Sequence, residues 1–168
     1  EFRRVLFRSD KAQLLSIAEG VGKMRAAVDA RQDRKLIIVG RTSAVAISNV
    51  DDAIARGRAY EAAGVDALFF TNVKTRAQLD AIAGAVKLPI ILGTPGAELQ
   101  DREYLASRGV RISLQGHAPF MAAVQATYDT LKAMRAGEKP ARVAPPEMIA
   151  RLSREPDHER WTREYLGG

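Results

Sequence analysis

Leu36-Ile37-Ile38-Val39-Gly40-Arg41-Thr42 is an apolar run that ends abruptly in a guanidinium group. The run is long enough for one buried strand and too short to span a membrane. A strand that is hydrophobic on both faces is typical of a parallel sheet covered by helices. We therefore predict a strand over Leu36–Val39, with Arg41 at its carboxyl end, where α/β proteins place their ligand chemistry.

Three further apolar segments follow the same plan and are separated by helical patterns. The predicted strands are Ala67–Phe70, Pro89–Leu92 and Val110–Leu114, and alternation in the last one indicates less complete burial. Such an order of helices and strands predicts right-handed crossovers and one parallel sheet. The predicted helices cover Lys11–Ala30, a segment from the N-cap Asn49 to Gly64, a segment opened by the capping box of Thr75 and Gln78, about Glu98–Ser107, and a long segment after His117.

The sequence changes character at both ends. Residues 1–10 mix arginine and apolar side chains without a sustained period, and we interpret them as a junction remnant. Residues 11–137 carry the predicted sheet and its helices. Residues 138–168 are predicted to form a proline-marked linker and a helical tail, whose Trp161 and Tyr165 are expected to dock onto a neighbouring surface.

Composition excludes several classes of function. The chain has 168 residues, 46% of them hydrophobic, which is enough for one globular core but short of the roughly 250 residues of a whole α/β barrel. There is no cysteine, so disulfide and thiolate chemistry are excluded, and a cytoplasmic location is expected. The net charge of +6 is dispersed among acidic residues and aromatics make up 6%, so we predict neither a nucleic-acid nor a membrane partner.

Polar side chains follow each predicted strand and form the candidate site. Arg41 can hold a carboxylate or phosphate through two parallel N–H bonds, although a structural salt bridge is the alternative. His117 can donate to an oxygen or exchange a proton near neutral pH, and a capping or core histidine is its alternative. Thr94 can position a substrate by a hydrogen bond, or can serve as a turn residue. The four strand ends are Arg41-Thr42-Ser43, Thr71-Asn72, Gly93-Thr94 and Gln115-Gly116-His117.

No metal or nucleotide motif accompanies these strand ends. Gly93, Gly96 and Gly116 form neither a G-x-G-x-x-G nor a Walker pattern. Asp51 and Asp52 are explained as acids at a helix start, where the helix dipole favours them. We therefore assign no metal ligand within this sequence.

The motifs resemble those of the isocitrate lyase/phosphoenolpyruvate mutase superfamily over about residues 14–137. The resemblance is carried by Glu19-Gly20-Val21-Gly22-Lys23, by Ile38-Val39-Gly40-Arg41-Thr42 and by Ala62-Ala63-Gly64-Val65-Asp66-Ala67. Gln115-Gly116-His117-Ala118, continuing to Ala126-Thr127-Tyr128-Asp129, looks most like the oxaloacetate decarboxylase branch.

The resemblance implies that this chain is the C-terminal half of a (β/α)8 barrel, with four parallel strands and a helical tail. Members are usually homo-oligomers that bind Mg²⁺ and a small 2-oxo acid or its enolate. By resemblance, Arg41 grips the substrate carboxylate and His117 contacts the substrate or enolate oxygen. The Mg²⁺ ligands are expected in the missing N-terminal half. Thr71 and Gly93 stand where the superfamily's lyases carry glutamate and asparagine, which argues against an isocitrate or methylisocitrate lyase.

The implied activity of the intact parent is a Mg²⁺-dependent loss of CO₂ from oxaloacetate or a similar small carboxylate. Two alternatives stay open at this point. One is a phosphoenolpyruvate mutase-type enzyme that acts on a carbon–phosphorus bond. The other is a non-catalytic half-barrel that self-associates through its exposed sheet edges.

Overall fold

The computed structural model describes residues 12–167, so the interpretation of residues 1–10 lies outside the described part of the chain. The chain divides into two compact units, one ending at Gly116 and the other beginning at His117. The predicted division at residue 137 stays a prediction. We describe each unit by itself.

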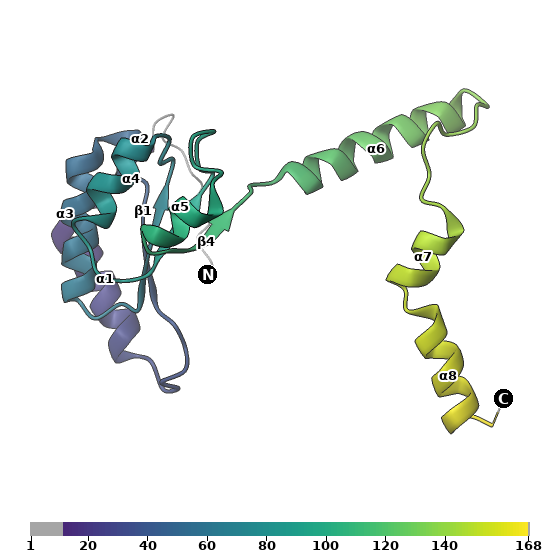
Figure 1. The fold of residues 1–168 in the computed structure, drawn as a ribbon, viewed down its shortest axis with the longest axis horizontal. Coiled ribbons are helices and arrows are strands. Elements are labelled where there is room, and N and C mark those ends of the chain that lie inside the picture. The colour runs from purple at the N-terminus through teal and green to yellow at the C-terminus, as the bar shows by residue number, and fades with distance from the viewer. Residues whose placement is uncertain (1–11, 168) are drawn as a thin grey trace, which may run out of the picture. The chain divides into compact units, whose positions relative to one another are not determined.

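The first unit contains a four-stranded sheet, drawn as arrows in Figure 1. Its strands are β1 (Val39–Thr42), β2 (Ala67–Thr71), β3 (Ile90–Gly93) and β4 (Val110–Leu114). They pair in chain order, and each neighbouring pair is parallel. The predicted parallel sheet is therefore confirmed, and its four carboxyl ends meet along one edge.

In the described part of the first unit, one helix precedes the sheet and four helices connect its strands. They are α1 (Ile17–Asp29), α2 (Ala44–Ile47), α3 (Val50–Ala62), α4 (Arg76–Ala83) and α5 (Arg102–Ser107). The predicted Asn49 cap is confirmed, because its side chain accepts a hydrogen bond from the amide of Asp52. The capping box of Thr75 and Gln78 is present as well. The short helix α2 was not predicted, since four residues carry too little periodicity to recognise.

Two predicted helices begin later than expected. The first one starts at Ile17 and not near Lys11, because Ser16 and Glu19 form a capping box that fixes the start of α1. The helix expected from Glu98 starts at Arg102, where the side chain of Asp101 accepts from the amides of Glu103 and Tyr104.

The prediction for the first strand was wrong by three residues. The strand occupies Val39–Thr42, and the preceding Leu36 and Ile37 are 55% and 59% exposed in a loop. This strand is aligned by its neighbour, because Asp66 accepts from the amide of Ile38 just before the ladder begins at Val39. Arg41 consequently lies inside β1, one residue before its end.

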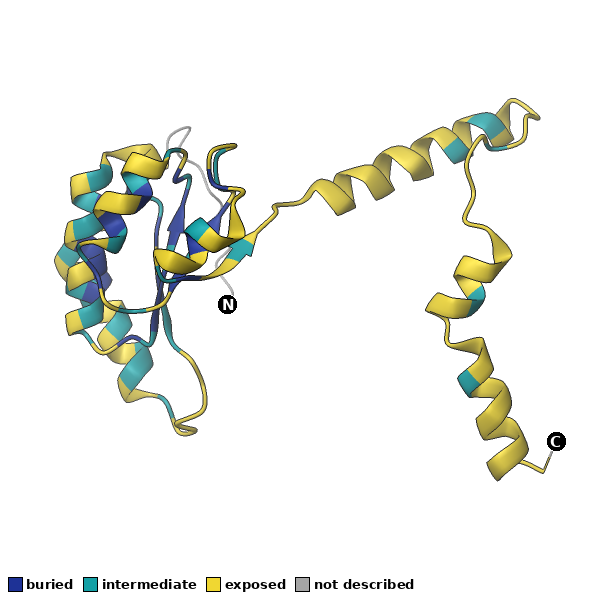
Figure 2. Cartoon of the chain, viewed as in Figure 1, coloured by how far each residue is buried: buried dark blue, intermediate teal, exposed yellow. Residues whose placement is uncertain are grey.

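Helices cover one face of the sheet and bury the core there. Leu68, Phe70, Ile90 and Leu92 are each at most 1% exposed on this covered face. Figure 2 shows the buried residues concentrated in the strands and on α3, while the outer surfaces of the helices are exposed. Because these side chains are every second residue of β2 and β3, the remaining residues of both strands point to the opposite face.

Tyr60 fills the space between α1 and β1 on the covered face. A Cβ atom at Gly40 would lie 3.0 Å from the Tyr60 ring, and one at Gly20 would overlap the Tyr60 hydroxyl. The buried Arg56 of α3 supports the same contact, since it donates to the carbonyl oxygen of Leu15 at 2.8 Å and to Asp52 at 3.0 Å. The glycine positions in this region therefore serve helix packing.

No helix of the described residues 12–116 covers the other face, which we call the open face. One row of paired residues crosses it from strand to strand, namely Arg41, Phe69, Ile91 and Ile112. Phe69 and Ile91 are half-buried, whereas Ile112 is 49% exposed and Leu114 is 45% exposed. The expected lower burial of the fourth strand is thereby confirmed.

The second unit is helical. It contains α6 (Ala118–Arg135), α7 (Pro146–Leu152) and α8 (Glu155–Tyr165), which confirms the long helix after His117 and the short helices of the tail. His158 is exposed and packs edge-on against Trp161, with ring centroids 5.6 Å apart. Across residues 12–167, no helix combines the length and the apolar character needed to cross a membrane.

Candidate active site

Arg41 lies on the open face near the carboxyl edge of the sheet. Its strand neighbours Gly40 and Thr42 are buried, whereas Arg41 itself is exposed. The guanidinium carbon lies 5.6 Å from the centroid of the Phe69 ring, which belongs to the paired residue of β2. That distance is within the range of a cation–π contact.

The alternative reading of Arg41 as a structural salt bridge is not supported. Among residues 12–167, no carboxylate lies within 4.0 Å of its guanidinium, and no hydrogen bond from it to another described residue is formed. Other arginines of this unit do have such partners, as Arg31 has in Asp66 at 2.8 Å. As far as residues 12–167 are concerned, the N–H groups of Arg41 are therefore available to an anion.

A short chain of hydroxyl and amide groups lines the edge beside Arg41. Thr71 donates to the Ser43 hydroxyl at 3.0 Å, and the Asn72 side-chain amide lies 3.4 Å from the Thr71 hydroxyl. Thr42 accepts from the amide of Ala44 at 3.1 Å, which starts α2. These contacts join the ends of β1 and β2, as the adjacent order of the strands predicted.

Asn72 and Thr94 follow β2 and β3 directly and both have left-handed backbone conformations, with φ of 62° and 54°. Asparagine tolerates this region, but a β-branched threonine there is strained. Thr94 is exposed, and its carbonyl oxygen accepts from Lys74 Nζ at 2.9 Å. Such strain persists where surrounding contacts impose it, and it is common at ligand sites.

The loops after β2 and β3 are joined by backbone contacts. The amide of Gly96 donates to the carbonyl oxygen of Val73 at 3.0 Å, and a Cβ atom at Gly96 would overlap the carbonyl oxygen of Lys74. Gly96 is thus required by close approach of the two loops. Sequence reasoning missed Lys74, since an isolated lysine in a loop carries no pattern.

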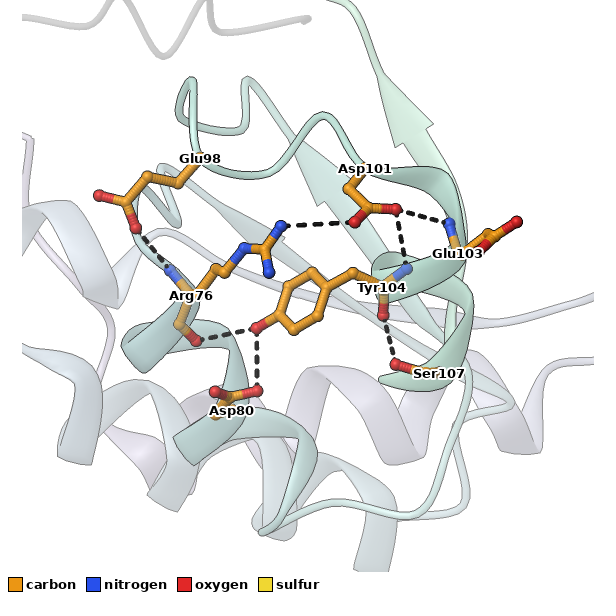
Figure 3. A network of polar contacts seen from close by, with 7 residues as sticks. All are labelled: Arg76, Asp80, Glu98, Asp101, Glu103, Tyr104 and Ser107. Atoms are coloured by element: carbon orange, nitrogen blue, oxygen red, sulfur yellow. Dashed lines mark hydrogen bonds and ion pairs between the residues drawn. The ribbon is translucent and has the colours of Figure 1, made fainter.

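A network of polar contacts joins α4, α5 and the loop after β3 (Figure 3). The Tyr104 hydroxyl donates to Asp80 at 2.9 Å, and Arg76 lies over the Tyr104 ring, with its guanidinium carbon 4.3 Å from the centroid. The backbone amide of Arg76 donates to Glu98 at 3.0 Å. Because Glu98 belongs to the loop after β3, the network fixes the end of the loop that begins at Thr94.

Ionisation of this network follows its contacts. The hydrogen bond from Arg108, at 2.6 Å, and then that from Tyr104 lower the pKa of the Asp80 carboxyl. Partial burial, followed by the hydrogen bond to Asp80, raises the pKa of the Tyr104 hydroxyl. Asp80 is therefore charged and Tyr104 neutral at pH 7, which is the state that the contacts require.

His117 is the N-cap residue of α6 and is exposed, with no side-chain capping bond. Among the described residues, the His117 side chain therefore neither caps a helix nor belongs to the core, which were the two alternatives to a functional role. His117 and Arg41 belong to different compact units. Their convergence in one site stays a prediction.

Metal ligands were not expected in this sequence. The described residues 12–167 contain no group of three or more histidine, cysteine, aspartate or glutamate side chains that could hold a metal ion. Asp51 and Asp52 lie in the first turn of α3, as predicted, and Asp52 pairs with Arg56. The residues that the structure describes thus do not fit a Mg²⁺ site.

Comparisons with known proteins identify the family. Residues 6–135 match the family model described as phosphoenolpyruvate phosphomutase. An oxaloacetate decarboxylase of Bradyrhizobium sp. (strain ORS 278) is 56% identical over 160 residues, which are 94% of this chain and 56% of that protein.

Solved structures agree with this assignment. A phosphonopyruvate hydrolase in complex with oxalate and Mg²⁺ is 28% identical, with a TM-score of 0.73 over 95% of this chain and 60% of that one. A phosphoenolpyruvate phosphomutase from Streptomyces platensis subsp. rosaceus has a TM-score of 0.76 at 22% identity, over 95% of this chain and 58% of that one, and supports the fold alone.

The chain spans little more than half the length of these relatives. Its four parallel strands with helices on one face are the C-terminal half of a (β/α)8 barrel, as predicted. The chain belongs to the phosphoenolpyruvate phosphomutase family, within the phosphoenolpyruvate mutase/isocitrate lyase superfamily.

Proposed function

We propose that this chain supplies the carboxylate-binding half of the active site of an oxaloacetate decarboxylase. The observation that carries the proposal is Arg41, an exposed guanidinium near the carboxyl edge of the sheet with no carboxylate partner among residues 12–167. A fork of N–H donors in this position suits a small carboxylate. The name of the Bradyrhizobium relative supports oxaloacetate as the substrate.

His117 is the second group of the proposed site. His117 lies three positions after Leu114, the last residue of β4, and three residues can span at most about 11 Å. The covalent chain therefore keeps His117 within reach of the carboxyl edge. Thr94, at the end of β3, is proposed to contact the substrate beside Arg41.

The reaction breaks the bond between C3 and C4 of oxaloacetate. CO₂ leaves, the electron pair of that bond passes to the 2-oxo oxygen to give the enolate of pyruvate, and one proton added at C3 completes the product. Arg41 would hold the carboxylate that stays on the product and oppose the developing negative charge. His117 would donate a hydrogen bond to the enolate oxygen or deliver the proton.

We include Mg²⁺ in the proposal, but we assign none of its ligands to residues 12–167. The relative solved with oxalate and Mg²⁺ supports a metal in the assembled enzyme, where it would polarise the substrate oxygens. Since residues 12–167 offer no ligand cluster, carboxylates outside them would have to hold it. We also propose that the assembled enzyme is a homo-oligomer.

A carbon–phosphorus enzyme is the second candidate function. The family model is named after phosphoenolpyruvate phosphomutase, and the relative solved with oxalate is a phosphonopyruvate hydrolase. Arginine binds phosphonate oxygens as well as carboxylates, so Arg41 alone does not separate the two. The third reading, a non-catalytic half-barrel, is supported by β1 and β4, which are unpaired edges among the described strands.

Complementation tests the proposal. The 168-residue chain is mixed with the part of the Bradyrhizobium oxaloacetate decarboxylase that it does not match, and loss of oxaloacetate is followed with Mg²⁺ present. We expect turnover in the mixture, and at least a tenfold fall in kcat/KM for Arg41→Lys, because a point charge replaces a planar fork. Arg34→Lys, in an exposed loop, is the matched control and should leave kcat/KM unchanged.

The outcomes separate the candidate functions. Unchanged kinetics in Arg41→Lys would remove this residue from the site. Turnover of phosphonopyruvate in place of oxaloacetate would favour the carbon–phosphorus enzyme. A mixture that forms a stable complex and turns over neither compound would favour the non-catalytic half-barrel.

A further inference from the structure

We infer that Phe69 is a positioning residue for the Arg41 guanidinium, and that residue 93 is glycine to leave room for the Phe69 ring. The inference rests on the proposed function and deepens it, because it explains how the proposed substrate-binding cation can be held without a carboxylate from residues 12–167. It rests on three neighbouring strands. β1 contributes Arg41, β2 contributes Phe69, and β3 contributes Gly93, which has no side chain.

The first step is the contact between Arg41 and Phe69. The two residues are directly paired in the parallel ladder, so their side chains leave the same face of the sheet. The guanidinium carbon lies 5.6 Å from the ring centroid, and residues 12–167 offer the guanidinium no hydrogen-bond acceptor. Among the described residues, the ring is thus the contact that can orient this cation.

The second step is the space above Gly93. A Cβ atom at this position would lie 2.6 Å from Cε2 and 2.8 Å from Cζ of Phe69, closer than real Cβ atoms approach other carbons. Gly93 is not among the described glycines with positive φ, so its backbone conformation does not require glycine. A side chain at residue 93 would therefore press on the Phe69 ring, which would have to shift to make room for it.

The third step is the choice of an aromatic side chain. An acid at residue 69 would neutralise Arg41 and compete with an incoming carboxylate. The face of a phenyl ring attracts the cation through its quadrupole yet accepts no conventional hydrogen bond, so the N–H donors stay free for the ligand. Phe69 can therefore restrict the orientation of the Arg41 guanidinium without engaging its N–H donors.

Nuclear magnetic resonance on the 168-residue chain tests this geometry directly. The Nε–H signal of Arg41 is recorded in wild type, Phe69→Leu, Phe69→Tyr and Gly93→Ala, with Phe120→Leu as the control because Phe120 is an exposed phenylalanine of the second unit. We expect a ring-current shift in wild type, its loss in Phe69→Leu, its retention in Phe69→Tyr and Phe120→Leu, and a changed shift in Gly93→Ala.

Ligand binding then separates the inference from the proposed function. Oxalate is titrated with Mg²⁺ into the complemented mixture, and we expect about two- to fivefold weaker binding in Phe69→Leu and wild-type affinity in Phe69→Tyr. A wild-type Arg41 signal without a ring-current shift, or equal affinity in wild type and Phe69→Leu, would overturn the inference. If wild type shows the shift but binds no oxalate, the positioning contact stands and the proposed function fails.

Discussion

The two faces of the sheet carry the same kinds of apolar side chain but different amounts of cover. On the covered face, Leu68, Phe70, Ile90 and Leu92 are at most 1% exposed beneath helices. On the open face, Ile112 and Leu114 remain nearly half exposed, and the row that contains Ile112 begins with Arg41. The covered face therefore holds the core of this unit, whereas the apolar side chains of the open face lack such cover among residues 12–167.

The largest expected difference between the two faces is in the free energy of unfolding that is lost when a leucine side chain is truncated. Leu92→Ala should lower the free energy of unfolding by about 2–5 kcal/mol, because a fully buried side chain leaves a cavity in the core. Leu114→Ala makes the same change on the neighbouring strand at a 45% exposed position, and should cost about 1 kcal/mol or less. Urea denaturation of both variants measures the difference, and equal losses would contradict the comparison.

A smaller effect is expected where the loops of the site meet. Gly96→Ala should cost about 1–3 kcal/mol, since its Cβ would overlap the carbonyl oxygen of Lys74 and push the two loops apart. Gly22→Ala, in the helix α1 with no atom within 4 Å of its Cβ, should be neutral or stabilise by up to about 1 kcal/mol. Thermal unfolding checks both, and a neutral Gly96→Ala would show that the loop contact is loose.

Sequence patterns predicted features set by near neighbours better than features set by distant residues. The caps at Asn49 and Thr75 were correct because each depends on residues within four positions of each other. The first strand was placed three residues early, because its limits depend on pairing with β2 and on Asp66, which lies 28 residues from Ile38. Apolarity alone could not separate the exposed Leu36 and Ile37 from the residues of the ladder.

The candidate site was predictable only as a set of strand ends. Arg41 and Thr94 were named from their places after apolar runs, and the parallel order of adjacent strands brings them to one edge. Phe69 was read as part of a strand, because nothing in the sequence tells which neighbour its ring will contact. Gly93 was recognised as part of a strand end without a nucleotide motif, whereas the structure places the Phe69 ring beside it.

Asp66, at the amino end of β2, provides a pH-dependent prediction. Asp66 accepts hydrogen bonds from the Ile38 amide and from Arg31, and the backbone bond is the larger cause of its lowered pKa. Because the carboxyl binds protons more readily in the unfolded chain, this stabilisation is full above its ordinary pKa of about 3.9 and is lost as pH falls through the lower folded value.

Asp66→Asn tests that interaction. The variant keeps an oxygen acceptor for Ile38 but loses the charge, so we expect it to be about 1 kcal/mol less stable than wild type at pH 7. The gap should narrow as the pH falls below 4, when wild type loses its charge as well. Urea denaturation at pH 7 and at several acidic values measures the gap, and a gap independent of pH would exclude the charge as its cause.

The smallest effect on stability, and the most direct test of the open face, is expected from Ile112→Asn. Ile112 is 49% exposed in an edge strand, so a polar side chain there should change the free energy of unfolding by about 1 kcal/mol or less. If the isolated chain self-associates by burying the open face, the same change should weaken association, since it places an amide in an apolar contact. Sedimentation velocity over a range of concentrations distinguishes the cases. If wild type and variant associate equally, the open face is not the contact, and the edges of β1 and β4, which are unpaired among the described strands, become the next surfaces to test.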